Sequence, residues 1–482
     1  MKPPEPSSLA QKQRSFPEWV ADAVFYQIFV DRFANGDRSN DLPGNVAWSS
    51  APTRDNTFGG DLQGILDHLP YLQDLGVNAL YLTPVFRARS NHKYDTCDYL
   101  QVDPAFGSEG LLRRLVSAAH EHGIRIVLDA VFNHCGEGFW AFEDVKRNGA
   151  SSPYAHWFFV DSFPVRTDPP NYQTCGASAY LPKLNVLNPE TRDYLLTVGS
   201  HWIEACDIDG WRLDVPWKVP LEFWRLFRAR VKQAKPEAYI VGEIWRDPEP
   251  WLQGDTCDGV MNYPLREAIL DFCVRETMDA EDIDYEMRHG QSAQGRSAPY
   301  QLNLLGSHDT PRLLTLCGGD LDRAILSAAL LFSSVGAPMI YYGDEVGVTG
   351  GNDPDCRKPM PWSEASQERK LFHTFRRLVS ARRQHPALRR GSFETVWLRN
   401  AVYAFRRRHG QDEILVVLNP RYAVPDLDVP LDQGSAGPRI WHDVLTDEQF
   451  VEDQGVLHLG LLPAKKAYLL SADELARAAR AR

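Results

Sequence analysis

Short apolar runs alternate with amphipathic segments over most of this chain, from Ala23 to about His385. The runs have the length and composition of buried strands, and segments between them, such as Leu111–Ala119 and Pro220–Arg230, have helical periodicity. This alternation predicts βα units around a parallel sheet. Eight runs fit the strand pattern, which is the number that closes a barrel. They are Val24–Val30, Ala79–Thr83, Arg125–Asp129, Gly210–Asp214, Tyr239–Val241, Gly259–Asn262, Gln301–Leu305 and Pro338–Tyr342.

Two regions depart from this alternation. From Cys135 to Pro189 the sequence is rich in aromatic residues, Pro and Asn and has no long helical period, which predicts a small inserted domain over the barrel mouth. After the last helical run, short alternating segments predict a terminal antiparallel β-sandwich. These segments are Glu394–Leu398, Ala401–Phe405, Glu413–Leu418 and Ala467–Leu470.

The predicted fold class is therefore α/β: a (β/α)8 TIM barrel with a subdomain inserted after strand 3 and a C-terminal antiparallel β-sandwich. We assign residues 1–134 and 190–388 to the barrel and residues 135–189 to the inserted subdomain B. Residues 389–472 form the predicted sandwich, and residues 473–482 are a tail.

Composition excludes several kinds of partner. The chain has 482 residues and a formal net charge of −12, which argues against nucleic acid and anionic membranes because both reward clustered Lys and Arg. No segment approaches the roughly 20 apolar residues of a membrane span, and Met1–Ser8 lacks the apolar core of a signal peptide. Eight cysteines stand singly, unlike a zinc site or a disulfide scaffold. We expect a cytoplasmic protein with reduced thiols; a secreted chain already lacking its signal peptide is the alternative.

Three acidic residues, Asp214, Glu243 and Asp309, each close an apolar, strand-like run. In a parallel barrel the C-terminal ends of the strands converge on one face, so these carboxylates can share a site. Taken singly, each is better explained as a strand-end cap or as half of a salt bridge, and only the joint pattern favours chemistry. Paired carboxylates are what glycoside hydrolysis needs, one to protonate a leaving oxygen and one to stay ionised.

Four motifs, taken in order, resemble those of the α-amylase family of retaining glycosidases. They are Asp129–His134, Gly210–Asp214, Glu243–Trp245 and Leu304–Asp309. Leu181–Asn185 and the opening Tyr26–Asp37 are similar to the neopullulanase and cyclomaltodextrinase group. The resemblance implies a hydrolase that cleaves α-1,4 bonds, with α-1,6 bonds as a further option, in maltooligosaccharides, cyclodextrins, pullulan or starch. The reaction would pass through a covalent glucosyl-enzyme intermediate, and transglycosylation would accompany it.

The same resemblance implies Asp214 as nucleophile, Glu243 as general acid and base, and Asp309 as the carboxylate that binds the distorted sugar. Arg212 lies two residues before Asp214 on one strand, so the side chains share a face and the guanidinium can keep the nucleophile ionised. Apolar residues flank Glu243 and predict a raised pKa for its carboxyl group. Retention implies that the nucleophile and the acid lie about 5 to 5.5 Å apart.

Further substrate contacts are implied on the glycone side. His134 and His308 are expected to hydrogen-bond sugar hydroxyls near the scissile bond, and Tyr94 to stack on the sugar ring. A single His beside an apolar strand is more often structural, so the motifs carry this interpretation. Asp353 and Arg357 match a pair that contacts the glycone end, although their i,i+4 spacing also fits an ordinary local salt bridge.

We assign Trp217, Lys218 and Trp245 to substrate binding, the first two of them on the acceptor side. After the nucleophile the related group typically reads Val-Ala-Asn-Glu, whereas this chain reads Val215-Pro-Trp-Lys218. The indole of Trp217 can stack on an acceptor sugar, and Lys218 donates hydrogen bonds where relatives offer a carboxylate. The alternative is that Trp217 packs beneath the barrel rim.

A calcium site is predicted where two segments rich in Asn, Asp and Gly come together, because the related group often binds calcium there. The expected oxygen ligands belong to Asn35, Asp37, Asn40, Asp41, Asp61 and the Gly59 carbonyl. Six oxygens fall within the coordination range of calcium. The alternative is a loop in which these residues serve only backbone geometry.

Two departures leave the function open in part. Relatives usually carry an N-terminal β-domain that pairs subunits, and about twenty residues precede the first barrel strand here, so we expect a monomer or weak homo-oligomer with an open cleft. A glucosyltransferase or maltose-rearranging isomerase would share every catalytic residue and is the main alternative. A non-catalytic carbohydrate-binding or chaperone-like subunit is a weaker one, because all three carboxylates are present. In each case the partner is an α-glucan oligosaccharide.

Overall fold

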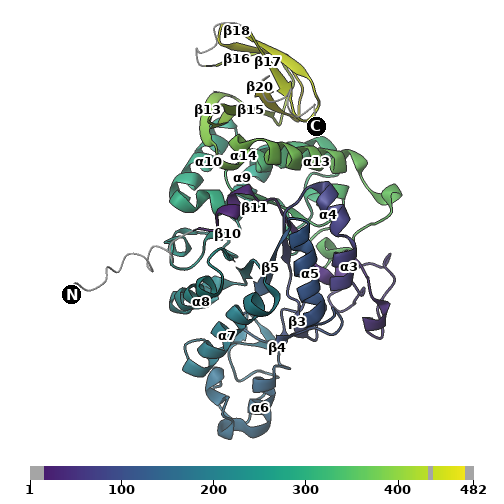
Figure 1. The fold of residues 1–482 in the computed structure, drawn as a ribbon, viewed down its shortest axis with the longest axis vertical. Helices are drawn as coiled ribbons and strands as arrows, with labels where there is room; N and C mark the ends of the chain where they lie inside the picture. Colours follow the sequence, from purple (N-terminus) through teal and green to yellow (C-terminus); the bar gives the residue numbers. More distant parts are fainter. Residues whose placement is uncertain (1–15, 432–437, 473–482) are drawn as a thin grey trace, which may run out of the picture.

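A barrel of eight parallel strands forms the centre of the protein (Figure 1). The computed structural model describes residues 16–431 and 438–472, and the tail assigned to residues 473–482 lies outside them. The barrel strands are β1 (Phe25–Ile28), β2 (Ala79–Leu82), β5 (Arg125–Ala130), β8 (Gly210–Leu213), β9 (Tyr239–Gly242), β10 (Gly259–Val260), β11 (Leu302–Leu304) and β12 (Ala337–Tyr341). They pair in the order β10-β9-β8-β5-β2-β1-β12-β11, and a parallel bridge between Met261 and Leu302 links the two ends. The barrel prediction is confirmed, since each predicted run overlaps one strand.

The inward-facing side chains change character along the strands. Alternate residues point into the barrel, and those near the N-terminal ends, such as Phe25, Val127 and Tyr239, form a separate apolar cluster. Two residues further along the same strands come polar or charged groups, such as Gln27 and Asp129, which are also buried. The barrel interior is thus apolar at one end and ionised at the other, and the ionised end is where the active sites of this architecture lie.

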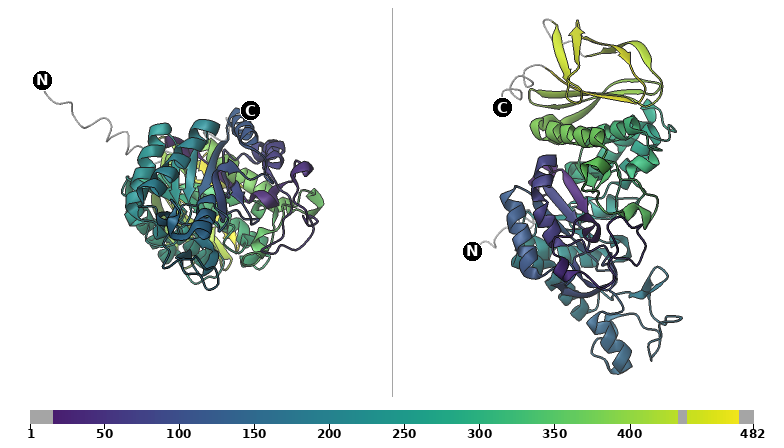
Figure 2. Two further views of the ribbon diagram at one scale, coloured as in Figure 1. Left: turned by 90° about the horizontal axis from the view of Figure 1, so that it is seen from below. Right: turned by 90° about the vertical axis from the view of Figure 1, so that its right-hand side faces the viewer.

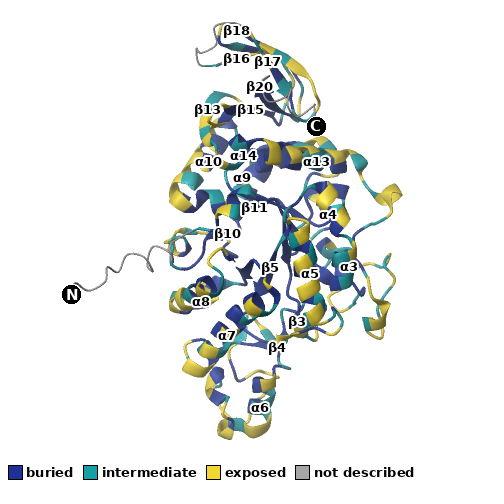
Figure 3. Ribbon diagram, in the orientation of Figure 1, coloured by how far each residue is buried: buried dark blue, intermediate teal, exposed yellow. Residues whose placement is uncertain are grey.

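Helices surround the barrel and bury their apolar faces against the strands (Figure 3). They are α2 (Val30–Phe33), α3 (Leu62–Asp67), α4 (Leu69–Leu75), α5 (Glu109–Glu121), α7 (Pro189–Cys206), α8 (Leu221–Ala234), α9 (Tyr263–Cys273), α10 (Ala280–Gln294), α11 (Leu313–Leu316), α12 (Leu321–Ser333), α13 (Arg369–Gln384) and α14 (Pro386–Arg390). The connection between β9 and β10 has only a short 3-10 turn, Glu249–Trp251. Within the described ranges, no helix is both long and apolar enough to cross a membrane.

Two excursions rise over the barrel mouth. The connection after β2 contains the hairpin β3 (Phe86–Ala88) and β4 (Thr96–Val102). The connection after β5 contains α6 (Trp140–Asn148) and the hairpin β6 (Thr174–Cys175) and β7 (Ser178–Pro182). No long helical period marks α6 in the sequence, because the helix has only nine residues. Its buried residues Ala141, Phe142 and Val145 nevertheless fall on one face.

The C-terminal strands form one antiparallel sheet of eight, at the end of the molecule opposite α6 (Figures 1 and 2). They are β13 (Ser392–Arg399), β14 (Val402–His409), β15 (Asp412–Asn419), β16 (Val424–Pro430), β17 (Arg439–Asp443), β18 (Gln449–Asp453), β19 (Val456–Leu462) and β20 (Lys466–Ala472). The sheet folds around its own apolar core, which includes Leu415, Trp441 and Leu457. Its other face packs on the barrel helices α12 and α14. The prediction located four of these strands and missed β16 to β19.

Candidate active site

Four carboxylates gather at the C-terminal end of the barrel strands. Asp129 lies within β5, Asp214 follows β8 directly, Glu243 follows β9 directly and Asp309 lies in the turn after β11. The first three are almost completely buried, whereas the Asp309 side chain is about one third exposed. The predicted trio therefore shares one site, and Asp129 joins it as a fourth acid to which the sequence analysis gave no separate role.

Arg212, which is buried within β8, holds three of these acids together. Its Nη1 atom lies 2.8 Å and 2.9 Å from the two carboxylate oxygens of Asp129 and 2.9 Å from Oδ1 of Asp214. Its Nη2 atom lies 2.9 Å from Oε2 of Glu243. A planar guanidinium with several fixed donors is suited to such shared contacts. The residues expected to act as nucleophile and acid are thus fixed relative to each other by one cation.

The electrostatics of the pair differ from the expectation for Asp214. Burial raises the pKa of Asp214 well above its ordinary value; Arg212 opposes this rise, and the charges of Glu243, Asp129 and Asp309 add to it. Arg212 contacts Asp214 as expected and favours its ionised form, but it does not keep the pKa of this carboxyl low, because burial is the larger effect and three carboxylates share the guanidinium. Burial, with Asp309, also raises the pKa of Glu243, as expected. Because the pKa values of both acids are raised, the pair keeps one proton as the pH approaches neutrality. Retaining hydrolysis requires this state, in which one acid is protonated and the other is ionised.

Backbone and indole groups orient Glu243. The backbone N–H of Val215 donates to Oε2 over 3.0 Å, and Nε1 of Trp245 donates to Oε1 over 2.8 Å. The Trp245 ring in turn stacks on Tyr263, with centroids 3.7 Å apart and an interplanar angle of 11°. Trp245 therefore fixes the expected acid as well as offering a partly exposed face to a ligand. The sequence analysis assigned it only to substrate binding and missed Tyr263.

The two histidines and Tyr94 lie around the same carboxylates. The hydroxyl of Tyr94 donates to Oδ2 of Asp129 over 2.9 Å and lies 2.7 Å from Nε2 of His308. Burial lowers the pKa of both His134 and His308 to about 3, so both imidazoles are neutral at physiological pH. Nε2 of His134 is buried without a hydrogen-bond partner. An unpartnered polar atom at this position is available to a sugar hydroxyl.

The pair Asp353 and Arg357 is more than a local salt bridge. Arg357 contacts Oδ1 of Asp353 at 2.9 Å and Oδ1 of Asp309 at 3.1 Å, and its Nε donates to the His308 carbonyl. The pKa of the Asp309 carboxyl is lowered even though burial opposes its ionisation: the cation Arg357 lowers it at neutral pH, and His308 contributes only when its imidazole is protonated. Asp309 is therefore a carboxylate at neutral pH. A cavity of about 620 Å³ is lined by Tyr94, Asp353 and Arg357, the residues expected on the glycone side.

Trp217 and Lys218 lie on the segment that follows Asp214. The side chain of Trp217 is 44% exposed, which argues against packing beneath the barrel rim. The Nζ atom of Lys218 lies 3.8 Å from Sγ of Cys175 in the inserted hairpin. Lys183, which the sequence analysis did not single out, donates from Nζ to the Lys218 carbonyl over 2.8 Å and to Oδ1 of Asn133 over 2.6 Å. The acceptor-side loop is thus tied to the insert.

The residues of the predicted calcium site come together near the start of α3. Asp61 caps α3 and accepts from the backbone N–H of Gly36 and Asp37 and from Nδ2 of Asn40. Asn35 donates from Nδ2 to Oδ1 of Asp41 over 2.7 Å. Gly59 has φ +85°, and a Cβ atom there would lie 2.4 Å from Oδ1 of Asp41. The carboxylate of Asp37 instead accepts from Ser39.

This loop has features that fit a cation with oxygen ligands. The side-chain oxygens of Asn35 and Asn40 are buried and have no hydrogen-bond partner. Amide and carboxylate oxygens are the donors that calcium prefers. No cluster of three or more His, Cys, Asp or Glu side chains suited to a metal occurs in residues 16–431 and 438–472. Any cation at this loop would therefore depend on amide and carbonyl oxygens as well as on carboxylates.

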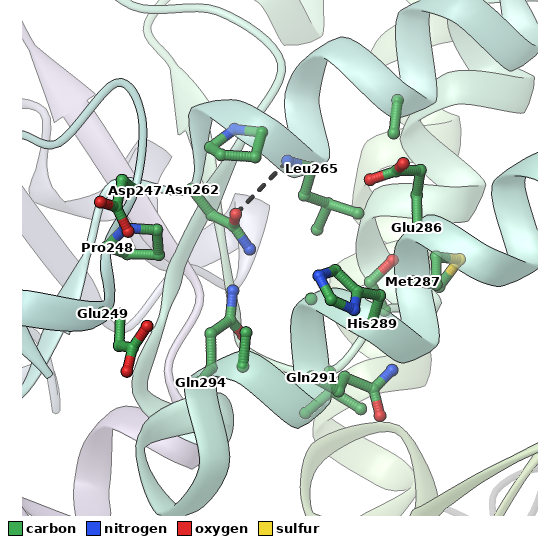
Figure 4. Close-up of a pocket in the computed structure, with 16 residues that line it drawn as sticks. Asp247, Pro248, Glu249, Asn262, Leu265, Glu286, Met287, His289, Gln291 and Gln294 are labelled. Atoms are coloured by element: carbon green, nitrogen blue, oxygen red, sulfur yellow. Dashed lines mark hydrogen bonds between the residues drawn. The ribbon is translucent and has the colours of Figure 1, made fainter.

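A separate cavity of about 320 Å³ lies between α9, α10 and the β9–β10 connection (Figure 4). It is lined by Asn262 and Leu265 of α9, by His289 and Gln294 of α10, and by Glu249. None of the four carboxylates lines it. Asn262 already accepts from the backbone N–H of Leu265 as the cap of α9. This cavity is therefore separate from the carboxylate site at the barrel mouth.

Comparison with known proteins agrees with this geometry. The family model described as "Alpha amylase, catalytic domain" matches residues 27–391. The chain belongs to the α-amylase family. It is therefore a glycoside hydrolase, as the paired carboxylates at the barrel mouth indicate.

Several members of the α-amylase family are similar to this chain over most of its length. A cyclomaltodextrinase of Geobacillus thermopakistaniensis is 46% identical over 93% of this chain and 76% of its own length. Neopullulanase 2 of Thermoactinomyces vulgaris is 46% identical over 93% of this chain and 77% of its own length. The solved structure of a cyclic α-maltosyl-(1→6)-maltose hydrolase of Arthrobacter globiformis is 45% identical, with a TM-score of 0.86, and the match covers 95% of this chain and 100% of that one.

Proposed function

We propose that this protein hydrolyses α-1,4-glucosidic bonds in maltooligosaccharides and cyclodextrins with retention of anomeric configuration, and that pullulan and its α-1,6 bonds are further substrates. The observation that carries the proposal is the contact of one buried guanidinium, Arg212, with both Asp214 and Glu243. The names of the similar cyclomaltodextrinase and neopullulanase support the substrate class. The exposed, uncharged indoles of Trp217 and Trp245 at the site also suit a neutral sugar.

In the first step, Asp214 attacks the anomeric carbon while Glu243 transfers its proton to the leaving glucosidic oxygen. The bond from the anomeric carbon to that oxygen breaks, and an ester between the sugar and Asp214 forms. Positive charge develops on the sugar ring in the transition state. Asp309, kept ionised beside Arg357, would stabilise this charge, and the neutral His134 and His308 would bind hydroxyl groups.

In the second step, the ionised Glu243 takes a proton from water while the water oxygen attacks the anomeric carbon. The ester to Asp214 breaks, the sugar leaves with its original configuration, and Glu243 is protonated again. A second sugar in place of water would give transglycosylation by the same route. The site geometry therefore supports hydrolysis and transfer alike, and the acceptor side sets their ratio.

A product profile tests this function. The protein would be incubated with maltotriose, β-cyclodextrin, pullulan, starch and cyclic α-maltosyl-(1→6)-maltose, and proton NMR would record the configuration of the first product. We expect one new reducing end for each bond cleaved and an α-configured product. Rearrangement without new reducing ends would instead favour a glucosyltransferase or maltose-rearranging isomerase. Failure to act on all five would favour a non-catalytic carbohydrate-binding subunit.

Trp217→Ala is expected to weaken action on long substrates and to reduce transfer. The exposed indole lies on the loop after Asp214, where it can stack on an acceptor sugar and hold it in place of water. We expect kcat/KM for maltotetraose to fall by about tenfold, with little change for an activated glucoside. The ratio of transfer to hydrolysis at high sugar concentration should fall as well. Equal losses on both substrates with an unchanged ratio would contradict an acceptor role.

We further propose that calcium binds the loop formed by Asn35, Asn40, Asp41, Asp61 and the Gly59 carbonyl. Two buried amide oxygens without partners support the proposal, as does the glycine whose lack of a side chain leaves Asp41 room. Asp37 was included in the predicted set, but its carboxylate is engaged by Ser39, so we assign it a secondary role. Calcium would stabilise the loop and take no part in the reaction.

Chelation is expected to lower the melting temperature more than the initial rate at moderate temperature. A ligand bound only to the folded state stabilises it by about 2.7 kcal/mol when present at 100 times its Kd, which corresponds to a shift of a few degrees. Asp41→Ala should abolish the chelator's effect, and Asp67→Ala, which removes an exposed acid at the end of α3, should keep it. An unchanged melting temperature when excess chelator is added to calcium-loaded protein, and when calcium is added to metal-free protein, would refute the site.

We also infer a cytoplasmic protein that is a monomer or a weak homo-oligomer. All eight cysteines are free thiols. Six of them are buried, and five of these six lie in the barrel region. Free thiols are typical of a reducing compartment. Light scattering after size exclusion at several protein concentrations measures the oligomeric state directly.

A further inference from the structure

We propose that a groove between α6 and the β3–β4 hairpin binds the distal, glycone-end sugars of long α-glucan chains, with Trp140 as the stacking platform. The proposal deepens the function proposed above and rests on it. It concerns a surface outside the carboxylate cluster, to which no role has been assigned so far.

One wall of the groove is a single face of α6. Trp140, Glu143, Asp144 and Arg147 line the groove and stand at positions i, i+3, i+4 and i+7, which share one side of a helix. The Trp140 side chain is 38% exposed although the residues on either side of it, Phe139 and Ala141, are buried. An indole that lines a cavity between charged side chains is suited to one face of a sugar ring.

The opposite wall comes from the β3–β4 hairpin. Arg87 of β3, Arg89 just after β3 and Asp98 of β4 line it, and Gly138 is a further lining residue. A Cβ atom on Gly138 would lie 2.9 Å from both Nε of Arg89 and Sγ of Cys97, so the absence of a side chain lets these groups lie close to the backbone. The cavity has a volume of about 530 Å³, within the range of small-molecule sites.

The charges of the groove favour a neutral ligand. Three arginines (Arg87, Arg89 and Arg147) and three acids (Asp98, Glu143 and Asp144) line it, so its formal charges cancel, +3 against −3. Guanidinium groups donate hydrogen bonds and carboxylates accept them, so the walls can satisfy hydroxyl groups of either orientation. A phosphate or another strongly charged ligand would meet a like charge on one wall. A polyhydroxylated chain would not.

The groove adjoins the cavity that we expect to hold the glycone, and the two share one lining residue, Arg89. Arg89 lines both this groove and the cavity that contains Tyr94, Asp353 and Arg357. Arg89 bridges the two regions through ion pairs with Glu137 at 2.9 Å and with Glu143 at 3.4 Å. Glu137 and the exposed Tyr180 line the glycone cavity as well. A chain that extends from Tyr94 past Tyr180 and Arg89 would therefore reach Trp140.

The rival explanation is that Trp140 only supports the inserted subdomain. Its ring makes edge-type contacts with Tyr154, Trp157 and Tyr194 at centroid distances of 5.0, 5.6 and 5.7 Å. These contacts hold the ring in place, which a binding platform also needs. The two explanations differ in one respect: a binding role depends on the length of the substrate, and a supporting role does not.

The test compares kcat/KM for maltotriose and for maltoheptaose in Trp140→Ala, Trp140→Phe and the parent. We expect Trp140→Ala to lower kcat/KM about tenfold for maltoheptaose, because the loss of one good ring contact has an effect of this size. For maltotriose we expect kcat/KM to fall by less than about twofold. Trp140→Phe should keep most of the activity on maltoheptaose because it keeps a ring. Tyr422→Ala, which removes an aromatic side chain that is 80% exposed on the C-terminal sheet, is the matched control and should change neither value.

Arg147→Ala covers the case in which Trp140→Ala loses stability. Arg147 is exposed on the same wall, and its truncation should cost about threefold on maltoheptaose alone. Equal losses on both substrates, or no loss on either, in Trp140→Ala and Arg147→Ala would overturn the groove proposal. If the parent cleaves neither substrate, the proposed function fails separately. Titration calorimetry with maltoheptaose then decides the groove, because the parent should bind it more tightly than Trp140→Ala, and equal affinity would refute the proposal.

Discussion

Replacing Asp214 by Asn is expected to abolish turnover on every α-glucan while leaving the fold intact. The substitution removes the carboxylate that would form the ester with the sugar and changes the side-chain volume little. Losses of essential catalytic groups amount to roughly 10⁴-fold or more in kcat. Arg212 would still contact the carboxylates of Asp129 and Glu243, so the buried guanidinium keeps its compensation. The variant should therefore melt within a few degrees of the parent.

The measurement is kcat on maltotriose together with a melting curve for the same preparation. Asp353→Asn is a useful comparison because it alters a carboxylate at the glycone end, beside Arg357, and leaves the nucleophile in place. We expect this second variant to raise KM by a larger factor than it lowers kcat. Near-normal turnover in a pure, folded Asp214→Asn protein would remove Asp214 from the mechanism.

Much of the barrel and the position of its carboxylates could be predicted from sequence because both depend on local periodicity. Runs of apolar residues that end in Asp214 or Glu243 put an acidic residue at the C-terminal end of a strand. The alternation of side chains along a strand, with a period of two residues, decides which of them face inward. Asp129 closes the run Arg125–Asp129 in the same way. The sequence therefore carries the same signal for Asp129 as for Asp214 and Glu243. The structure shows the carboxylate of Asp129 in contact with Arg212.

The electrostatics could not be predicted, because they depend on strands that are distant in sequence. The local pattern shows Arg212 two residues before Asp214 and suggests an ion pair of one cation with one anion. The folded chain brings Asp129 from β5 and Glu243 from β9 to the same guanidinium. Burial and these added charges raise the pKa of Asp214 instead of leaving Arg212 to lower it.

Elements with weak periodicity were missed for a different reason. The strands β16 to β19 alternate buried with exposed positions only in part. The turns between β17, β18 and β19 contain residues at positive φ, such as Asp447 and Gln454. The helix α6 is too short for its apolar face to stand out within an aromatic insert. Pairing within the sheet and packing of the insert stabilise these elements more than local propensity does.

Glu243→Gln is expected to be inactive on natural glucans and partly active on substrates whose leaving group needs no proton, such as a maltosyl fluoride. Gln cannot donate a proton to the leaving oxygen, and its single carbonyl oxygen can keep only one of the two hydrogen bonds that Glu243 accepts, from the Val215 backbone at Oε2 or from Trp245 at Oε1. The ester to Asp214 should then accumulate, because no base activates water for the second step. Added azide, which needs no base, should restore turnover and give an azide product of retained configuration.

The pH dependence provides an independent measure of the same role. Burial and Asp309 raise the pKa of Glu243, so the protonated acid persists towards neutral pH, and activity on natural glucans should fall as the pH rises through that pKa. In Glu243→Gln, cleavage of the fluoride should lose this alkaline decline, because the residue that titrates is gone. Equal losses on natural and activated substrates, without rescue by azide and with the alkaline decline unchanged, would contradict the assignment of Glu243 as acid and base.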